Sequence, residues 1–240
     1  VEVVGDIRAS LNALEKLVRK RKRSHTYDTI RDFLRHEIED YKDDKGFPVK
    51  PQKILWDMRA TLGDEDILIS DVGAHKMWIG RLFPAYEPNT VLISNGLAAM
   101  GFSLPSAIAA KMIYPERKVL AACGDAGFLM NVQELETASR LNLGIVVLIF
   151  NDGAHGLIEW KAQGKFKKKF SYGLGFKNPD FVKLVESFGG RGYRISKGDN
   201  LQKILKDAFA SKKLCLVDVP VDYAENEKLS KRLGGFVCPL

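Results

Sequence analysis

Residues 119–154 read VLAACGDAGFLMNVQELETASRLNLGIVVLIFNDGA, and this stretch decides the fold. Two apolar runs of strand length, 119–123 and 144–150, enclose a segment of helix length at 128–142. The second run is apolar at every position from Ile145 to Phe150, so both of its faces must be buried. A parallel strand covered by helices on both sides has this character. The stretch therefore predicts a strand–helix–strand crossover.

The same alternation extends over most of the chain. Further strands are expected at 67–70, 90–94, 192–195 and 214–219, and further helices at 51–62, 97–113, 178–188 and 200–211. A repeated strand–helix–strand order needs crossover connections. The predicted fold class is therefore α/β, a doubly wound and mostly parallel sheet with helices on both faces.

The pattern is different before residue 51. Residues 1–4 are expected to form a short strand, followed by a helix over 7–20. We interpret 1–24 as the C-terminal remnant of a central domain, 25–50 as a charged linker, 51–224 as the main domain and 225–240 as a C-terminal tail. The basic block Arg19–Arg23 is interpreted as a solvated helix end rather than a nucleic-acid patch.

Composition excludes several classes of protein. Of 240 residues, 45% are apolar, and no apolar run reaches the roughly 18 residues needed to cross a membrane. The 37 basic and 30 acidic residues leave a net charge of +7, which suits an anionic ligand but not a dedicated nucleic-acid binder. Cys123, Cys215 and Cys238 are scattered and odd in number, and no secretory signal is visible, so a reducing, cytoplasmic location is expected.

Ligands of a doubly wound sheet bind beyond the carboxyl ends of its strands. After the strand ending at Cys123 come Gly124, Asp125, Ala126 and Gly127. Their small side chains let backbone N–H groups approach an anion such as a phosphate. Asp125 would repel that phosphate unless a divalent cation such as Mg²⁺ lay between them. The alternative is that Asp125 is only a helix N-cap.

The next strand ends at Phe150 and is followed by Asn151, Asp152, Gly153 and Ala154, which lie 26 to 29 positions after Asp125. The carboxyl ends of neighbouring parallel strands lie at one edge of a sheet. Asp125 and Asp152, with a turn carbonyl as third ligand, would provide the oxygen ligands that Mg²⁺ prefers. Two solvated turn carboxylates are the alternative.

These residues form part of a longer pattern. Residues 124–152, GDAGFLMNVQELETASRLNLGIVVLIFND, resemble the thiamine diphosphate motif that opens with Gly-Asp-Gly and closes with Asn-Asn or Asn-Asp. SDVGAHKMW at 70–78, ISNGLAAMGFSLPSAIAAK at 93–111 and PVDYAENEKL at 220–229 look like the acetolactate synthase group of that superfamily. The resemblance covers residues 51–240, and residues 1–20 look like the end of the family's central domain.

The resemblance implies a role for each matching residue. Asp125, Asp152 and the carbonyl of Ala154 would hold Mg²⁺, and the N–H groups of Ala126 and Gly127 would meet the diphosphate. The remaining cofactor-binding positions that it implies are His75 at the diphosphate, Ala98 whose carbonyl accepts from the aminopyrimidine, Met100 beneath the bent cofactor, Gly124 and Asn151. His75 and Met100, taken alone, would be ordinary core residues.

Three positions depart from the family pattern. Ala126 stands where the motif usually has its second glycine, and Ala74 where many relatives have Gln before the histidine. Lys161 occupies the position that helps set substrate choice, where better-known relatives have Trp or Gln. Lys161 could pair with the carboxylate of a 2-oxo acid, or it could be a solvated helix lysine like Lys165, Lys167, Lys168 and Lys169.

The function implied is the diphosphate-binding portion of an enzyme dependent on thiamine diphosphate and Mg²⁺ that condenses two pyruvates to 2-acetolactate and CO₂. The activating glutamate is expected on a pyrimidine-binding domain of the same or a second subunit. We therefore assign no catalytic residue to this chain and expect it to be inactive alone. The full-length form is expected to be a homo-oligomer, without a nucleic-acid or membrane partner. No prediction is made about FAD, which the central domain would hold.

Two alternatives remain open at this point. The first keeps the cofactor but changes the reaction, as in other 2-oxo acid decarboxylases, oxidases or acetyltransferases. The second is a cofactor-binding or assembly module without activity, which Ala126 and Ala74 motivate.

Overall fold

The computed structural model describes residues 2–19, 25–166 and 173–232 of the chain. The chain divides into two compact units, Val1–Phe33 and Leu34–Leu240, which we describe separately. Cys238, Lys167 to Lys169 and much of the predicted tail lie outside the described residues. Within the described part, no helix has both the length and the apolar character needed to cross a membrane.

The first unit contains helix α1, Ile7–Leu17, which begins at the N-cap Asp6, whose side chain accepts a hydrogen bond from the N–H of Ala9 (2.8 Å). The prediction of a strand before α1 is wrong for residues 2–4, which form no regular secondary structure. Val3 and Val4 are exposed there, so their apolar side chains gain nothing from burial in a sheet.

Helix α2, His25–Glu39, covers much of the segment that we interpreted as a charged linker. Its last residues belong to the second unit, where Ile38 is buried in the core and Leu34 packs against it. These two residues are four positions apart and so lie on one face of the helix. Their burial explains why a segment rich in charge is helical here.

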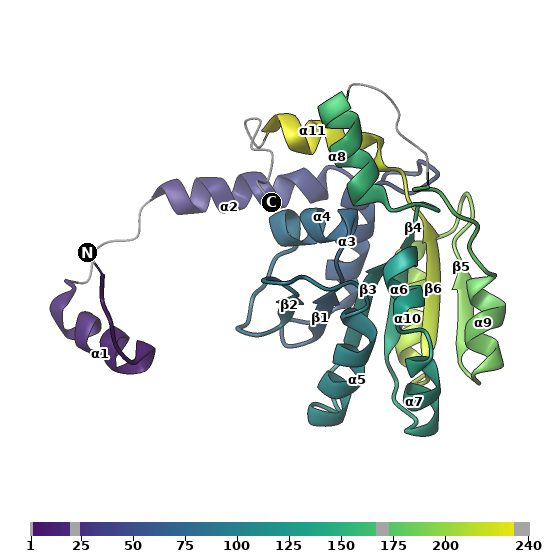
Figure 1. The fold of residues 1–240 in the computed structure, drawn as a ribbon, viewed down its shortest axis with the longest axis horizontal. Helices are drawn as coiled ribbons and strands as arrows, with labels where there is room; N and C mark the ends of the chain where they lie inside the picture. Colours follow the sequence, from purple (N-terminus) through teal and green to yellow (C-terminus); the bar gives the residue numbers. More distant parts are fainter. Residues whose placement is uncertain (1, 20–24, 167–172, 233–240) are drawn as a thin grey trace. The chain divides into compact units, whose positions relative to one another are not determined.

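The second unit is built on a six-stranded sheet in the order β2-β1-β3-β4-β6-β5 (Figure 1). All of its pairings are parallel. The strands are β1 Ile67–Ser70, β2 Val91–Ile93, β3 Val119–Gly124, β4 Val146–Asn151, β5 Arg191–Arg194 and β6 Cys215–Pro220. The predicted fold class is confirmed.

The two faces of the sheet have separate cores. Helices α3 (Pro51–Thr61), α4 (Ala74–Leu82) and α10 (Leu201–Ala210) pack on one core, and α5 (Ser103–Ile113), α6 (Asp125–Met130), α7 (Glu134–Arg140) and α9 (Phe181–Ser187) on the other. Leu148 belongs to the first core and Val147 to the second. This alternation within a fully apolar run is what the sequence predicts for a strand buried on both faces.

Several helices differ from their predicted extents. The helix expected over 97–113 begins only at Ser103, and the helix expected over 128–142 is divided into α6 and α7. The division lies near Asn131, whose side chain donates a hydrogen bond to the carbonyl of Gly101 (2.8 Å). Helix α4 was not predicted, nor were helices α8 (Gly156–Phe166) and α11 (Asn226–Arg232) and the 3₁₀ helix η1 (Tyr223–Glu225).

Candidate functional site at the carboxyl ends of β3 and β4

A cavity of about 260 Å³ lies beyond the carboxyl ends of β1, β3 and β4. Register places the ends together, because Gly124 pairs with Phe150 across β3 and β4. The cavity is lined by nine of the predicted site residues, namely His75, Ala98, Met100, Gly124, Asp125, Ala126, Gly127, Asp152 and Ala154. Residues from four separate stretches of sequence therefore meet in one place, although their roles toward a ligand stay predictions.

Asp125 is the first residue of α6 and is buried. Its Oδ1 accepts from the N–H of Ala126 (2.8 Å), and its Oδ2 accepts from the N–H of Gly153 (2.8 Å) and from Nδ2 of Asn178 (2.7 Å). Burial raises the pKa of this carboxyl, and those three hydrogen bonds oppose the rise. The N-cap of α6 is Gly124, so Asp125 does not have the capping role that the alternative interpretation gave it.

Asp152 lies close enough to Asp125 for each charge to disfavour the other. Burial, and then the negative charge of Asp125, raise the pKa of Asp152 to about 7. Gly156 leaves room for the Asp152 carboxylate, since a Cβ at that position would collide with Oδ2 of Asp152. Two partly buried carboxylates facing one cavity are unfavourable until a cation lies between them.

The donor set fits Mg²⁺, because it consists of oxygen atoms and carries two negative charges. Among the described residues no three His, Cys, Asp or Glu side chains gather into a metal cluster. This agrees with a predicted set of only two carboxylates and one main-chain carbonyl, that of Ala154.

His75 is buried in the first turn of α4, with its ring stacked on Phe150 at 5.4 Å between centroids. Burial lowers the pKa of this imidazole, which is therefore neutral near pH 7. Its Nε2 is buried and has no hydrogen-bond partner among the described residues. An unpartnered ring nitrogen beside the cavity is suited to bind a polar group of a ligand.

Ala98 and Met100 lie on the loop before α5, in which Gly96, Ala98 and Gly101 all have positive φ. Asp71 holds the end of this loop, since its carboxylate accepts from the N–H groups of Gly101 (3.0 Å) and Ser103 (2.9 Å) and from the Ser103 hydroxyl (2.9 Å). Asp71 was not among the predicted site residues, although its position directly after β1 was an available signal.

Asn151 is the predicted site residue that does not line the cavity. Its amide donates to Oδ1 of Asp218 (2.8 Å) and accepts from Nδ2 of Asn178 (2.9 Å). Asn178 was missed because no motif or periodicity near it indicates a site. Lys161 and Tyr223 do line the cavity, and burial raises the pKa of Tyr223 well above its ordinary value.

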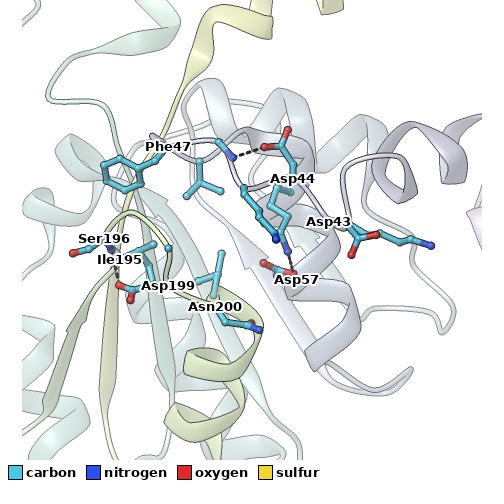
Figure 2. A pocket seen from close by; sticks show the side chains of 15 residues that line it. Asp43, Asp44, Phe47, Asp57, Ile195, Ser196, Asp199 and Asn200 are labelled. Carbon is cyan, nitrogen blue, oxygen red and sulfur yellow. Dashed lines mark hydrogen bonds and ion pairs between the residues drawn. The ribbon is translucent and has the colours of Figure 1, made fainter.

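A second cavity, of about 370 Å³, contains none of the predicted site residues. Figure 2 shows Asp44 and Asp57 on one side of it and Ser196 and Asp199 on the other. Oδ1 of Asp57 accepts from Nζ of Lys53 (2.6 Å), and Oδ2 of Asp199 accepts from the N–H of Ser196 (2.7 Å). These carboxylates are thus held by neighbours within the wall, and we assign this cavity no ligand.

Residues 71–219 match the family described as thiamine pyrophosphate enzyme, C-terminal TPP binding domain. The match covers more than half of the chain, and it includes both carboxylates and the loop that carries Met100. The chain therefore belongs to this family of thiamine diphosphate-dependent enzymes.

Within that family the chain is similar to acetolactate synthases, as its motifs predicted. It is 33% identical to the acetolactate synthase of Bacillus subtilis, over 98% of this chain and 42% of that protein. It is also 33% identical to the acetolactate synthase isozyme 3 large subunit of Escherichia coli, over 98% of this chain and 42% of that protein. The chain thus spans less than half the length of these relatives.

A solved structure agrees on the fold. The thiamine diphosphate-dependent 4-hydroxybenzoylformate decarboxylase of Rhodococcus jostii RHA1 superposes with a TM-score of 0.68, over 75% of this chain and 34% of that chain. The two are 22% identical in sequence, so the likeness concerns the fold alone.

Proposed function

We propose that this chain is the diphosphate-binding portion of a thiamine diphosphate- and Mg²⁺-dependent acetolactate synthase-like enzyme, which condenses two pyruvates to 2-acetolactate and releases CO₂. The observation that carries the proposal is the meeting of Asp125 and Asp152 in one cavity at adjoining strand ends. The similarity to acetolactate synthases supports the reaction class. We also propose a cytoplasmic location.

The residues of the cavity have complementary tasks in this proposal. Asp125, Asp152 and the carbonyl of Ala154 hold Mg²⁺, and the N–H groups of Ala126 and Gly127 bind diphosphate oxygens. For this the N–H of Ala126 turns from Oδ1 of Asp125, to which it donates in the free chain, to the diphosphate. The methyl group of Ala126 leaves its N–H in place, so the departure from the Gly-Asp-Gly motif removes no donor. When bound, thiamine diphosphate supplies an electron sink for decarboxylation of a 2-oxo acid.

Two further residues orient the ligand. The neutral imidazole of His75 donates to a diphosphate oxygen in the tautomer that carries its proton on Nε2, without bringing a second cation to the site. Lys161, on α8, lines the cavity and is exposed, so its ammonium can meet the carboxylate of an incoming 2-oxo acid. We therefore propose Lys161 as a substrate-orienting residue.

The remaining parts of the enzyme are proposed to come from elsewhere. The relatives are more than twice as long as the part that this chain matches. We propose that a pyrimidine-binding domain, of the same chain or of a second subunit, completes the site and brings the activating glutamate. Homo-oligomerisation would place such a domain opposite the cavity.

Calorimetry tests the proposal directly. With the pyrimidine-binding domain supplied, thiamine diphosphate titrated into this chain is expected to bind in the presence of Mg²⁺ and to bind much more weakly with EDTA. Asp125→Asn should abolish the magnesium dependence, whereas Asp207→Asn, on α10, should not alter it. Binding that is indifferent to Mg²⁺ would contradict the proposal.

Product analysis distinguishes the reactions. With the pyrimidine-binding domain supplied, pyruvate is expected to yield 2-acetolactate. Acetaldehyde as the main product would instead indicate a simple decarboxylase. Acetyl phosphate would indicate an oxidase or an acetyltransferase.

A further inference from the structure

A chain of hydrogen-bonded side chains lies behind the Asp125 carboxylate. Asn178 uses both hydrogens of its Nδ2, one toward Oδ2 of Asp125 (2.7 Å) and one toward Oδ1 of Asn151 (2.9 Å). Asn151 in turn donates its own amide hydrogen to Oδ1 of Asp218 (2.8 Å). Three polar side chains after Asp125 are thus connected in series.

The direction of both amides follows from the charges at the ends of this series. An amide oxygen turned toward the Asp125 carboxylate would place two acceptors against each other, so nitrogen must face it. The same argument applies to Asn151 against Asp218. Each amide therefore has one stable orientation rather than two.

The far end of the series is anchored by an ion pair. Nε of Arg194 donates to Oδ2 of Asp218 (3.1 Å), and its Nη2 donates to Oδ1 of Asp180 (2.8 Å). Asp180 is the N-cap of α9 and lies two residues after Asn178. Arg194 thereby holds both the partner of Asn151 and the segment that carries Asn178.

Asn178 has little else to hold it. Its Oδ1 is buried and has no hydrogen-bond partner among the described residues. The two donated hydrogen bonds therefore set the position of the amide. Without them, the donor that stays on Oδ2 of Asp125 is the N–H of Gly153.

We propose that Asn178 is a positioning residue for the Asp125 carboxylate, and that Asn151 acts through Asn178 rather than on the cofactor directly. The N–H of Gly153 and Nδ2 of Asn178 both donate to Oδ2 and prevent the carboxylate from rotating. Its Oδ1 then stays beside the N–H of Ala126. This inference rests on the magnesium site of the proposed function. Asn151, which was predicted to bind the cofactor, is thereby reassigned as a residue that holds Asn178 in position against the Asp125 carboxylate.

The first test is metal affinity. Mg²⁺ is titrated calorimetrically into the chain with thiamine diphosphate present. Asn178→Ala, and Asn178→Leu, which retains side-chain bulk without a donor, should each weaken Mg²⁺ binding about 10- to 100-fold, as loss of such support typically does. Asn200→Ala is the matched control. Asn200 is the N-cap of α10, and its Oδ1 accepts a hydrogen bond from the N–H of Lys203, so the substitution removes one hydrogen bond away from the cavity and should leave the Mg²⁺ affinity unchanged. Wild-type affinity in both Asn178 variants would overturn the proposal.

The second test separates indirect from direct action of Asn151. If Asn151 acts through Asn178, the Asn151→Ala/Asn178→Ala double variant should bind Mg²⁺ and thiamine diphosphate no more weakly than Asn178→Ala alone. If Asn151 contacts the cofactor, the two losses should add, and the assignment of Asn151 would be overturned.

A third measurement needs no ligand and keeps this inference distinguishable from the proposed function. In a crystal structure of metal-free Asn178→Ala, the Asp125 carboxylate should have rotated from the orientation that it has in wild type in the same crystal form, because the N–H of Gly153 is then the single donor left on Oδ2. An unmoved carboxylate would overturn the positioning role, even if Mg²⁺ binds. Failure of wild type to bind Mg²⁺ would overturn the proposed function, whereas the carboxylate's position would still decide this inference.

Discussion

At the scale of single residues, the site is defined by two carboxylates that repel each other. Asp125 receives three hydrogen bonds, whereas Asp152 accepts a long one from the N–H of Ala154 (3.3 Å). The less supported carboxylate has its pKa raised to about 7. Of the two carboxylates, Asp152 is therefore the one whose negative charge more strongly destabilises the metal-free chain.

This asymmetry predicts how Asp152→Asn changes stability with pH. Between the ordinary pKa of 3.8 and about 7, the folded chain holds a proton on Asp152 that the unfolded chain has released. Rising pH therefore lowers the free energy of unfolding through this group across that window, and the full penalty is present above it. The amide introduced by the substitution carries no charge, so the variant escapes the penalty.

The measurement is urea unfolding of both metal-free proteins across that pH range. The difference in unfolding free energy, variant minus wild type, should increase with pH up to about 7 and then level off. With saturating Mg²⁺ and thiamine diphosphate the order should reverse, because the amide offers one ligand oxygen without charge. A difference that is independent of pH would contradict the electrostatic account.

At the scale of elements, Asp71 joins the end of β1 to the start of α5. It is fully buried, and its carboxylate receives the backbone N–H groups of Val72, Gly101 and Ser103 and the Ser103 hydroxyl. The loop between them carries Ala98 and Met100 into the cavity. The Gly101 end of that loop is held by the Asp71 carboxylate and by the side chain of Asn131, whereas Leu97 is fully exposed.

Ser103→Ala is expected to loosen this connection. A lost hydrogen bond to a charged group costs about 1.5–3 kcal/mol, and Asp71 would keep its three backbone donors. Thermal unfolding should show the loss, and calorimetry should show weaker thiamine diphosphate binding because the loop is less well held.

Ser106→Ala, one turn further along α5, is the control. Ser106 is half-buried and lies on the same helix, but it takes no part in the contact with Asp71. An equal loss of stability in both variants would show that the helix, rather than the carboxylate, is sensitive to substitution.

At the scale of the whole molecule, the two units differ in how many apolar side chains they bury. Helix α1 contains no buried residue, whereas the second unit has two cores, one on each face of its sheet. Ile38 near the end of α2 already belongs to one of these cores. The second unit should therefore carry the cooperative unfolding transition.

Deletion of residues 1–19 is expected to leave the Tm of that transition unchanged, as scanning calorimetry would show. Ile38→Ala, in contrast, should lower the free energy of unfolding by about 2–5 kcal/mol, because it leaves a cavity in the core. A clear fall in Tm on the deletion would show that the first unit stabilises the second.

The sequence alone determined the parallel sheet and the edge at which Asp125 and Asp152 meet. The apolar run from Ile145 to Phe150 can be buried only between two layers of helices, which requires crossovers and a parallel sheet. Parallel strands in turn bring Asp125 and Asp152 to one edge. These conclusions follow from residues close together in the sequence, where periodicity is informative.

Only the tertiary structure decided what surrounds those carboxylates. Asn178 follows Asp125 by 53 positions and Asp218 follows Asn151 by 67, and no local pattern links either pair. Their partners are set by which strand ends become neighbours and how the intervening chain folds back. Long-range hydrogen bonds leave no periodic signal in the sequence, so Asn151 could be placed behind the Asp125 carboxylate rather than in the cavity only once the fold was known.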